Sequence, residues 1–206
     1  MTKRIYKYII FFILSITYTF VNAQWERLPG VYGGRIYEVC VDSTTIYTTN
    51  IYSGPHRSID SAKTWQAINN GLLDDFGHRI FLTIAAKDNL IFTGTYDDGI
   101  FKSEDYGVTW STVNNGVPLI GMQLGRVFDL IFCDSVLICR IADTIKRFDF
   151  NSETWLPVEV TPGNSDARSL TKIQNSIYLL NSNGIYVSED NCNTWSFYAN
   201  IPVLAP

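Results

Sequence analysis

The five tryptophans of this 206-residue chain are spaced almost evenly along it. They are separated by 40, 45, 45 and 40 residues and lie at Trp25, Trp65, Trp110, Trp155 and Trp195. A repeat of about 40 to 45 residues, filled with short strands and turn residues, is typical of a β-propeller in which each repeat forms one four-stranded blade. The spacing therefore predicts an all-β fold of four-stranded antiparallel blades.

The residues before each tryptophan also repeat in register. Threonine stands one position before, aspartate five before and serine seven before in most copies. The members are Ser58, Asp60, Thr64 and Trp65; Ser103, Asp105, Gly107, Thr109 and Trp110; and Ser188, Asp190, Thr194 and Trp195. These residues resemble the Asp-box, or bacterial neuraminidase, repeat Ser-x-Asp-x-Gly-x-Thr-Trp, and the copy that ends at Trp110 matches it in full. The other two copies carry Ala62 and Cys192 in place of glycine, and the unit that ends at Trp155 carries Phe148 and Phe150 in place of serine and aspartate.

The repeated aspartates are interpreted as structural. Asp and Ser side chains accept hydrogen bonds from nearby backbone N–H groups and close tight turns, and glycine supplies the positive φ that such turns need. The tryptophan ring is suited to packing between blades. The resemblance implies the same, because the Asp box joins the third and fourth strands of a blade on the side away from the binding surface.

Four complete units fit the chain. They span about residues 35–69, 80–113, 126–160 and 168–199. Residues 24–28 are predicted to form an extra strand d whose blade partners are missing, so we expect an incomplete ring: a truncated gene product, a fragment, or one arc of an oligomeric ring. An open blade face would be apolar and able to self-associate.

The N-terminus predicts export. Lys3, Arg4 and Lys7 precede an apolar run, and a small-residue cleavage site ends at Ala23, which together indicate a signal peptide over residues 1–23. Residues 24–206 would then be one propeller domain with no membrane span, secreted or held in the cell envelope of a bacterium. That part has 13 Lys and Arg against 20 Asp and Glu, so nucleic acid is a poor partner for it.

Metal and disulfide chemistry are not predicted. Cys40, Cys133, Cys139 and Cys192 show no metal-ligand spacing, and the chain has only two histidines. A two-residue turn at 134–135 would pair Cys133 with Val136 and Cys139 with Leu130, which places the two sulfurs on opposite sheet faces. Buried, unpaired thiols are expected, with no cofactor and no metal.

An arginine stands at the start of each predicted first strand. Arg35, Arg79, Arg126 and Arg168 are separated by 44, 47 and 42 residues, so they would lie around the mouth of the central channel and could bind carboxylate or phosphate. Tyr52 and Tyr96 fall in loops at the same end. The alternative is that the arginines pair with neighbouring loop acids such as Asp74, Asp75, Asp97, Asp98 or Asp166 and only support the fold.

Two functional classes follow from the resemblance. Asp-box propellers include sialidases and endoglucanase-like glycoside hydrolases, and also non-catalytic binders such as sortilin and photosystem II stability/assembly factor-like proteins. Sialidase activity is not expected, since Tyr37 stands where the Arg-Ile-Pro motif has proline. Asp75 and Asp98 are weak candidates for a glycosidase acid pair. The hypothesis is a secreted non-catalytic binding or scaffold module for a protein or glycan, anionic partners included; the alternatives are a glycoside hydrolase or a truncated remnant.

Overall fold

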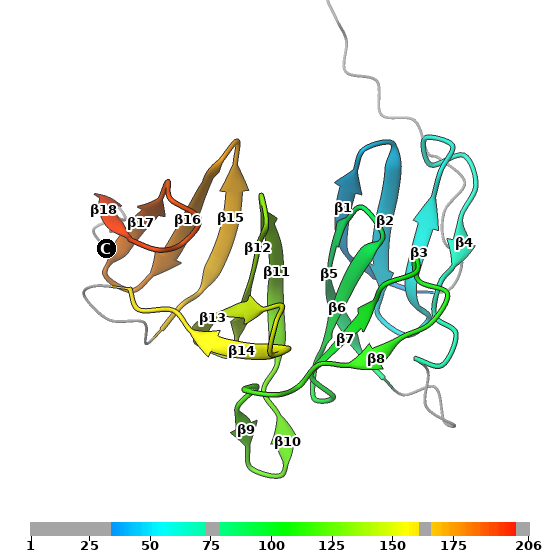
Figure 1. Cartoon of the computed structure of the whole chain (residues 1–206), viewed down its shortest axis with the longest axis horizontal. Helices are drawn as coiled ribbons and strands as arrows, with labels where there is room; N and C mark the ends of the chain where they lie inside the picture. Colours follow the sequence, from blue (N-terminus) through cyan, green and yellow to red (C-terminus); the bar gives the residue numbers. More distant parts are fainter. Residues whose placement is uncertain (1–33, 73–78, 161–165, 201–206) are drawn as a thin grey trace, which may run out of the picture.

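The described part of the chain is built entirely from strands and turns. The structure, a computed structural model, describes residues 34–72, 79–160 and 166–200. These residues form four antiparallel sheets of four strands each and one two-stranded hairpin (Figure 1). The predicted all-β fold with four-stranded blades is confirmed, and the four blades form an open arc without ring closure. The predicted extra strand at 24–28 and the predicted signal peptide lie outside the described residues.

Each blade is a meander in which consecutive strands are neighbours. Blade 1 contains β1 (Ile36–Asp42), β2 (Thr45–Asn50), β3 (Gly54–Ser58) and β4 (Gln66–Ala67). Blade 2 contains β5 (Phe81–Lys87), β6 (Leu90–Thr95), β7 (Ile100–Ser103) and β8 (Ser111–Thr112). Blade 3 contains β11 (Val127–Cys133), β12 (Val136–Ile141), β13 (Thr144–Asp149) and β14 (Thr154–Pro157). Blade 4 contains β15 (Ser169–Ile173), β16 (Ser176–Asn181), β17 (Gly184–Ser188) and β18 (Ser196–Ala199), and the hairpin of β9 (Leu119–Ile120) and β10 (Gln123–Leu124) lies between blades 2 and 3.

Tight turns fix the register of the first two strands in each blade. In blade 2, Lys87 pairs with Leu90 across a two-residue turn, and Asp88 there adopts φ 55°, as short hairpin turns require. In blade 3, Cys133 pairs with Val136 and Leu130 with Cys139, as predicted from sequence. The two cysteines therefore point to opposite faces, and all four cysteines are free thiols; Cys40 is half-buried and the others are buried.

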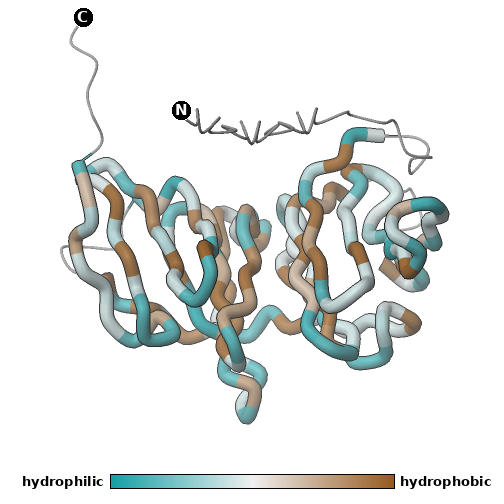
Figure 2. Tube along the Cα trace, turned by 90° about the horizontal axis from the view of Figure 1, so that it is seen from above, coloured by the Kyte–Doolittle hydropathy of each residue, from teal (hydrophilic) through white to brown (hydrophobic). Residues whose placement is uncertain are grey.

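The core lies between the blades. The largest cluster joins blades 2 and 3 and includes Phe92, Leu130, Phe148 and Trp155. A second cluster joins blades 3 and 4, and smaller ones join blades 1 and 2. Figure 2 shows the apolar segments along the strands and hydrophilic residues at many of the turns. Stacking of neighbouring blades thus buries the apolar faces that no single blade could bury alone.

A repeated hydrogen bond links the innermost strands of successive blades. A β-bulge near the start of the strand precedes Glu38, Thr83 and Asp129 in β1, β5 and β11. Each of these side chains accepts a hydrogen bond from a backbone N–H of the next blade. The bonds are Ile84 N–H to Glu38 Oε2 at 3.3 Å, Leu130 N–H to Thr83 Oγ1 at 3.0 Å, and Leu170 N–H to Asp129 Oδ2 at 3.3 Å. The bulge, which re-aims a side chain, thereby sets the contact between blades.

The turn between the third and fourth strands has one geometry in blades 1, 2 and 4. In blade 2, Asp105 accepts from the N–H of Thr109 at 2.8 Å, from the Thr109 hydroxyl at 2.6 Å and from the Ser103 hydroxyl at 2.8 Å, while Ser103 Oγ accepts from Gly107 N–H at 2.8 Å. Asp60 and Asp190 make the same contacts. These hydrogen bonds lower the pKa of all three aspartates to about 2. We call these three segments the Ser-Asp turns.

Candidate functional site

One end of the arc gathers the turns that carry the sequence-predicted site residues. There the start of each innermost strand is hydrogen-bonded to the end of the second strand. Ile51 N–H donates to the carbonyl of Arg35, Tyr96 N–H to Ile80, Ala142 N–H to Arg126, and Arg168 N–H to Leu180. We call this end the mouth surface; it comprises these strand ends and the turns between the second and third strands. The Ser-Asp turns join the third and fourth strands of a blade and lie at the end of the arc opposite the mouth surface.

Two of the four arginines at the mouth surface are engaged by acids. Arg79 Nε lies 2.8 Å from Asp98 Oδ2, the same guanidinium contacts the carbonyl of Leu72, and it stacks 4.7 Å from the centroid of Phe101. Arg168 pairs with Asp166 at 3.1 Å. For these two arginines the geometry is that of the alternative weighed above, in which loop acids neutralise the charge.

The other two arginines carry no ion pair among the described residues. Arg126 is exposed, and its guanidinium lies 3.7 Å from the ring centroid of Tyr96, a cation–π contact that leaves its charge available. Arg35 is exposed. Tyr52 is an exposed residue of the turn between β2 and β3. The mouth surface therefore brings Arg126 and Tyr96 together.

Of the two candidate glycosidase acids, Asp98 lies among the described residues. Asp98 holds Arg79 in an ion pair, and its backbone N–H donates to Thr95 Oγ1 at 3.0 Å within the β6–β7 turn. These contacts are those of a turn residue. Asp75 lies outside the described residues.

The β9–β10 hairpin projects from the mouth surface (Figure 1) and was not predicted from sequence. Its two-residue turn begins at Gly121, whose φ is 68°, and places Met122 at the tip with 95% of its surface exposed. Leu119 and Ile120 are also exposed. The only indication of it in the sequence was the spacing of the four arginines. The interval from Arg79 to Arg126, 47 residues, is the longest of the three.

The hairpin is held in place by blade 2. Leu124 N–H donates to the carbonyl of Asp97 at 3.1 Å, and the Gln123 amide donates to Asp97 Oδ2 at 3.0 Å. Gly125 N–H closes its base on the carbonyl of Pro118 at 2.8 Å. Burial, followed by the neighbouring Asp98 charge, raises the pKa of Asp97. The apolar tip is thus presented on an anchored support.

A groove of about 270 Å³ separates the hairpin from blade 3. Pro118 and Ile120 line one side of it, and the β12–β13 turn lines the other. The remaining lining residues are Ile141, Ala142, Asp143, Thr144, Ile145, Lys146 and Pro157. Apolar walls with a few charged groups at the rim are typical of a site that receives an apolar side chain of a ligand. We call this feature the hairpin groove.

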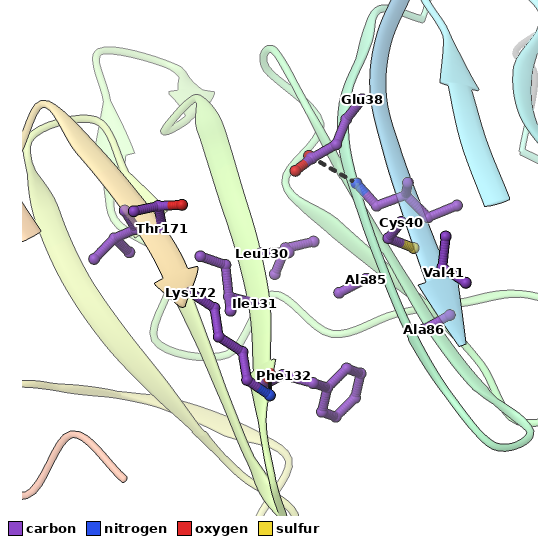
Figure 3. Close-up of a pocket in the computed structure, with 12 residues that line it drawn as sticks. Glu38, Cys40, Val41, Ala85, Ala86, Leu130, Ile131, Phe132, Thr171 and Lys172 are labelled. Atoms are coloured by element: carbon purple, nitrogen blue, oxygen red, sulfur yellow. Dashed lines mark hydrogen bonds between the residues drawn. The ribbon is translucent and has the colours of Figure 1, made fainter. Parts of the chain in front are cut away.

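A second hollow, of about 310 Å³, runs along the axis of the arc between β1, β5, β11 and β15 (Figure 3). Glu38 points into it from β1, and the dashed line in Figure 3 marks its bond from the N–H of Ile84. Burial raises the pKa of Glu38 to about 7. Lys172 Nζ donates to the carbonyl of Phe132 at 3.1 Å on the other side. This wall of innermost strands is where a propeller has its central channel.

Within residues 34–72, 79–160 and 166–200, no cluster of three or more His, Cys, Asp or Glu side chains could hold a metal ion. The same residues include no helix long and apolar enough to span a bilayer.

The solved structures that resemble the chain are β-propellers. One is an ancestral GH74 enzyme, with TM-score 0.59, 16% identity and 82% of this chain covered. A second is YCF48 bound to D1 peptide, with TM-score 0.56, 15% identity and 83% covered. A third is the extracellular domain of a one-component system from B. thetaiotaomicron, with TM-score 0.60, 16% identity and 85% covered.

The match is to part of each of these proteins. The chain spans 24% of the length of the GH74 enzyme and of the sensor domain, and 56% of the YCF48 chain. No protein-family model and no curated protein matches the sequence. At these identities the likeness establishes the fold, which is that of a β-propeller.

Proposed function

We propose that the chain is a binding module that recognises a protein through the mouth surface, with the hairpin groove as the principal contact. The observation that carries the proposal is the anchored, apolar β9–β10 hairpin, whose tip residue Met122 is 95% exposed. Large exposed apolar groups beside a polar rim mark interaction sites on soluble proteins. Methionine and arginine are also enriched in protein–protein interfaces.

The groups around the groove define the partner further. An apolar side chain of the partner would enter between Ile120 and Ile141, and the Tyr96–Arg126 stack offers a cation for a carboxylate of the same partner. The groove has room for one or two side chains, which suits an extended peptide or a loop. Among proteins of this fold, YCF48 has been seen with a bound peptide, and this precedent supports a peptide in preference to a glycan.

Two further points belong to the same proposal. The three Ser-Asp turns support membership of the Asp-box propellers, and the N-terminal sequence supports secretion or a place in the bacterial cell envelope after cleavage near Ala23. The glycoside hydrolase alternative is not favoured by a specific observation, because Asp98 is engaged with Arg79. A truncated remnant would not need an anchored apolar hairpin.

Peptide display against the purified chain tests the proposal. Selected peptides should lose affinity at least about tenfold, or about 1.4 kcal/mol, when Ile120→Ser or Arg126→Ala is introduced. Ile59→Ser is the matched control, because Ile59 is also an exposed isoleucine but lies in the Ser-Asp turn of blade 1 at the far end. Peptides that bind both site variants as tightly as the unmodified chain would refute the assignment of the site. A glycan array gives the other arm: glycans that depend on the same two residues, with no peptide bound, would refute the partner class.

A further inference from the structure

The three contacts between blades define what each blade face requires. We call the face toward the next blade in sequence the leading face, and the face toward the previous blade the trailing face. On the trailing faces, Ile84, Leu130 and Leu170 occupy equivalent positions, since each donates its N–H to the preceding blade. All three side chains are buried. A trailing face therefore offers an apolar side chain and a backbone donor, and a leading face offers an acceptor.

Blade 1 leaves its trailing face uncovered along β1. Val39 is the residue equivalent to Ile84, because it follows Glu38 as Ile84 follows Thr83. Its side chain is 56% exposed, and its neighbours on the same face, Ile36 and Val41, are exposed as well. Among the described residues no side chain accepts a hydrogen bond from Val39 N–H. The position that is buried in blades 2, 3 and 4 is thus open in blade 1.

Blade 4 leaves its leading face uncovered. Ser169 is equivalent to Glu38, Thr83 and Asp129, and its hydroxyl has no partner among the described residues. Beside it lies a hollow of about 380 Å³ with mostly apolar walls. The other lining residues are Thr171, Ile173, Tyr178, Leu180, Ile185 and Tyr198. Ile173 is 56% exposed, whereas Cys133 at the same position of blade 3 is fully buried.

At its outer edge, the leading face of blade 4 is also less polar than the leading faces of blades 1 to 3. Just before the third-to-fourth-strand turn, blades 1 to 3 carry a cation that reaches the next blade. Arg57 donates to the carbonyl of Tyr106 at 3.0 Å, Lys102 contacts Glu153, and Arg147 donates to Asn193 Oδ1 at 3.0 Å. Blade 4 has Val187 at this position. Terminal repeats that face water have polar outer faces, whereas β1 exposes Val39 and Val41 and the leading face of blade 4 exposes Ile173.

We propose that these two faces bind each other, so that the leading face of blade 4 in one copy of the chain packs on the trailing face of blade 1 in a second copy. The occupant is inferred from complementarity, since Ser169 supplies the acceptor and the apolar hollow, and Val39 supplies the donor and the apolar side chain. The same pairing of faces occurs at all three interfaces within the chain. Two copies joined in this way through both face pairs contain eight blades, and closed propellers typically have about four to eight. A heterologous contact of this kind closes into a ring when the rotation allows.

Measurement of the solution mass by light scattering, with variants that block one face each, tests this pairing. The unmodified chain should show twice the mass of one copy. Val39→Glu blocks the trailing face and Ile173→Glu blocks the leading face, so each variant alone should be monomeric. An equimolar mixture of the two retains one intact pair of faces and should regain the doubled mass. Ile59→Glu, at an exposed isoleucine away from both faces, should behave like the unmodified chain.

Two results of these mass measurements would overturn the proposal. An unmodified chain with the mass of one copy would overturn the proposal and would indicate that another segment of the same chain covers β1. A doubled mass that persists in either single variant would also overturn it, because the two copies would then pair without the blocked face. Both substituted residues are exposed, so far-ultraviolet circular dichroism should be unchanged. Val41→Glu and Thr171→Glu, on the same two faces, repeat the test with independent side chains.

Discussion

The Ser-Asp turn of blade 2 and the corresponding turn of blade 3 have the same spacing between repeat positions, from Ser103 to Trp110 and from Phe148 to Trp155, but they are stabilised differently. In blade 2 the polar network around Asp105 holds the turn, and Tyr106 and Gly107 adopt φ 60° and 86°. In blade 3, Phe148 and Phe150 stand where the others have serine and aspartate, and only Glu153 has a positive φ, of 50°. Strand pairing there continues to Asp149 and Thr154.

Aromatic packing takes the place of the hydrogen-bond network in blade 3. Phe148 lies 4.8 Å from Trp155 and 5.2 Å from Phe92 of blade 2, and Phe150 packs against Phe148 at 5.0 Å, all measured between ring centroids. Trp155 is the most buried of the four described tryptophans. The comparison shows that one repeat position can be stabilised either by a polar turn or by burial at the blade interface.

The largest expected effect comes from removing the aromatic group. Phe148→Ala should lower the free energy of unfolding by about 3–5 kcal/mol, as truncation of a buried phenylalanine does, in a urea titration. Phe150→Ala, on the same turn but 40% exposed, should cost about 1 kcal/mol. Equal costs for the two variants would argue that the turn backbone, and not the cluster, stabilises blade 3.

The next effect concerns the glycine of the Ser-Asp turn. Gly107→Ala should lower the free energy of unfolding by about 2–3 kcal/mol, because a side chain at φ 86° is strained and its Cβ would lie 2.8 Å from Cβ of Ile68. Ser152→Ala, at the same repeat position in blade 3, should change it by less than about 0.5 kcal/mol. Thermal unfolding compares the pair, and similar shifts would erase the distinction between the two turns.

A smaller effect is expected at the buried serine. Ser103→Ala should cost about 1–2 kcal/mol, since it leaves the N–H of Gly107 without its acceptor. The same change at Ser58 and Ser188 should cost a similar amount, because the Ala62 and Cys192 N–H groups lose the same bond. Denaturant titrations of the three single variants provide the measurement. A negligible cost at all three sites would mean that the network is incidental to the fold.

The smallest expected effect is that of pH on the Ser-Asp turns, and it lies well below neutrality. The pKa of Asp105 is lowered from 3.8 to about 2 by the hydrogen bonds from Thr109 and Ser103. The unfolded chain therefore binds the proton more readily, so the contribution of the carboxylate is present above the unfolded pKa and is lost as the pH falls through about 2. Carboxyl carbon NMR should find midpoints near 2 for Asp60, Asp105 and Asp190. Midpoints near 3.8 would show that the hydrogen bonds of the Ser-Asp turns do not stabilise these carboxylates.

The sequence was sufficient for the parts of the fold that repeat. The tryptophan period predicted the blades, and short turn signals predicted the register of Cys133 with Val136. It was insufficient where one blade departs from the rest. Phe148 could be recognised as a missing serine, but its packing against Phe92 depends on a neighbouring blade and has no local signal. The bulge that aims Glu38 at Ile84 likewise depends on the pairing of β1 with β2.

The candidate site could be predicted only as a region. The arginine spacing located the mouth surface, but the partners of Arg79 and Arg168 depend on how the loops fold back, which spacing does not encode. The β9–β10 hairpin has only two paired residues in each strand, too few for a strand pattern to stand out. Its position against blade 2 depends on Asp97, a residue read from sequence only as part of a turn.

Conversion of the blade 3 turn into a Ser-Asp turn is the most direct test that burial replaces hydrogen bonding there. The triple variant Phe148→Ser, Phe150→Asp, Ser152→Gly gives blade 3 the complete repeat without changing its length. We expect its free energy of unfolding in urea to fall by at least about 3 kcal/mol, because the cluster with Phe92 and Trp155 is emptied. A variant as stable as the unmodified chain, or more stable, would contradict this account.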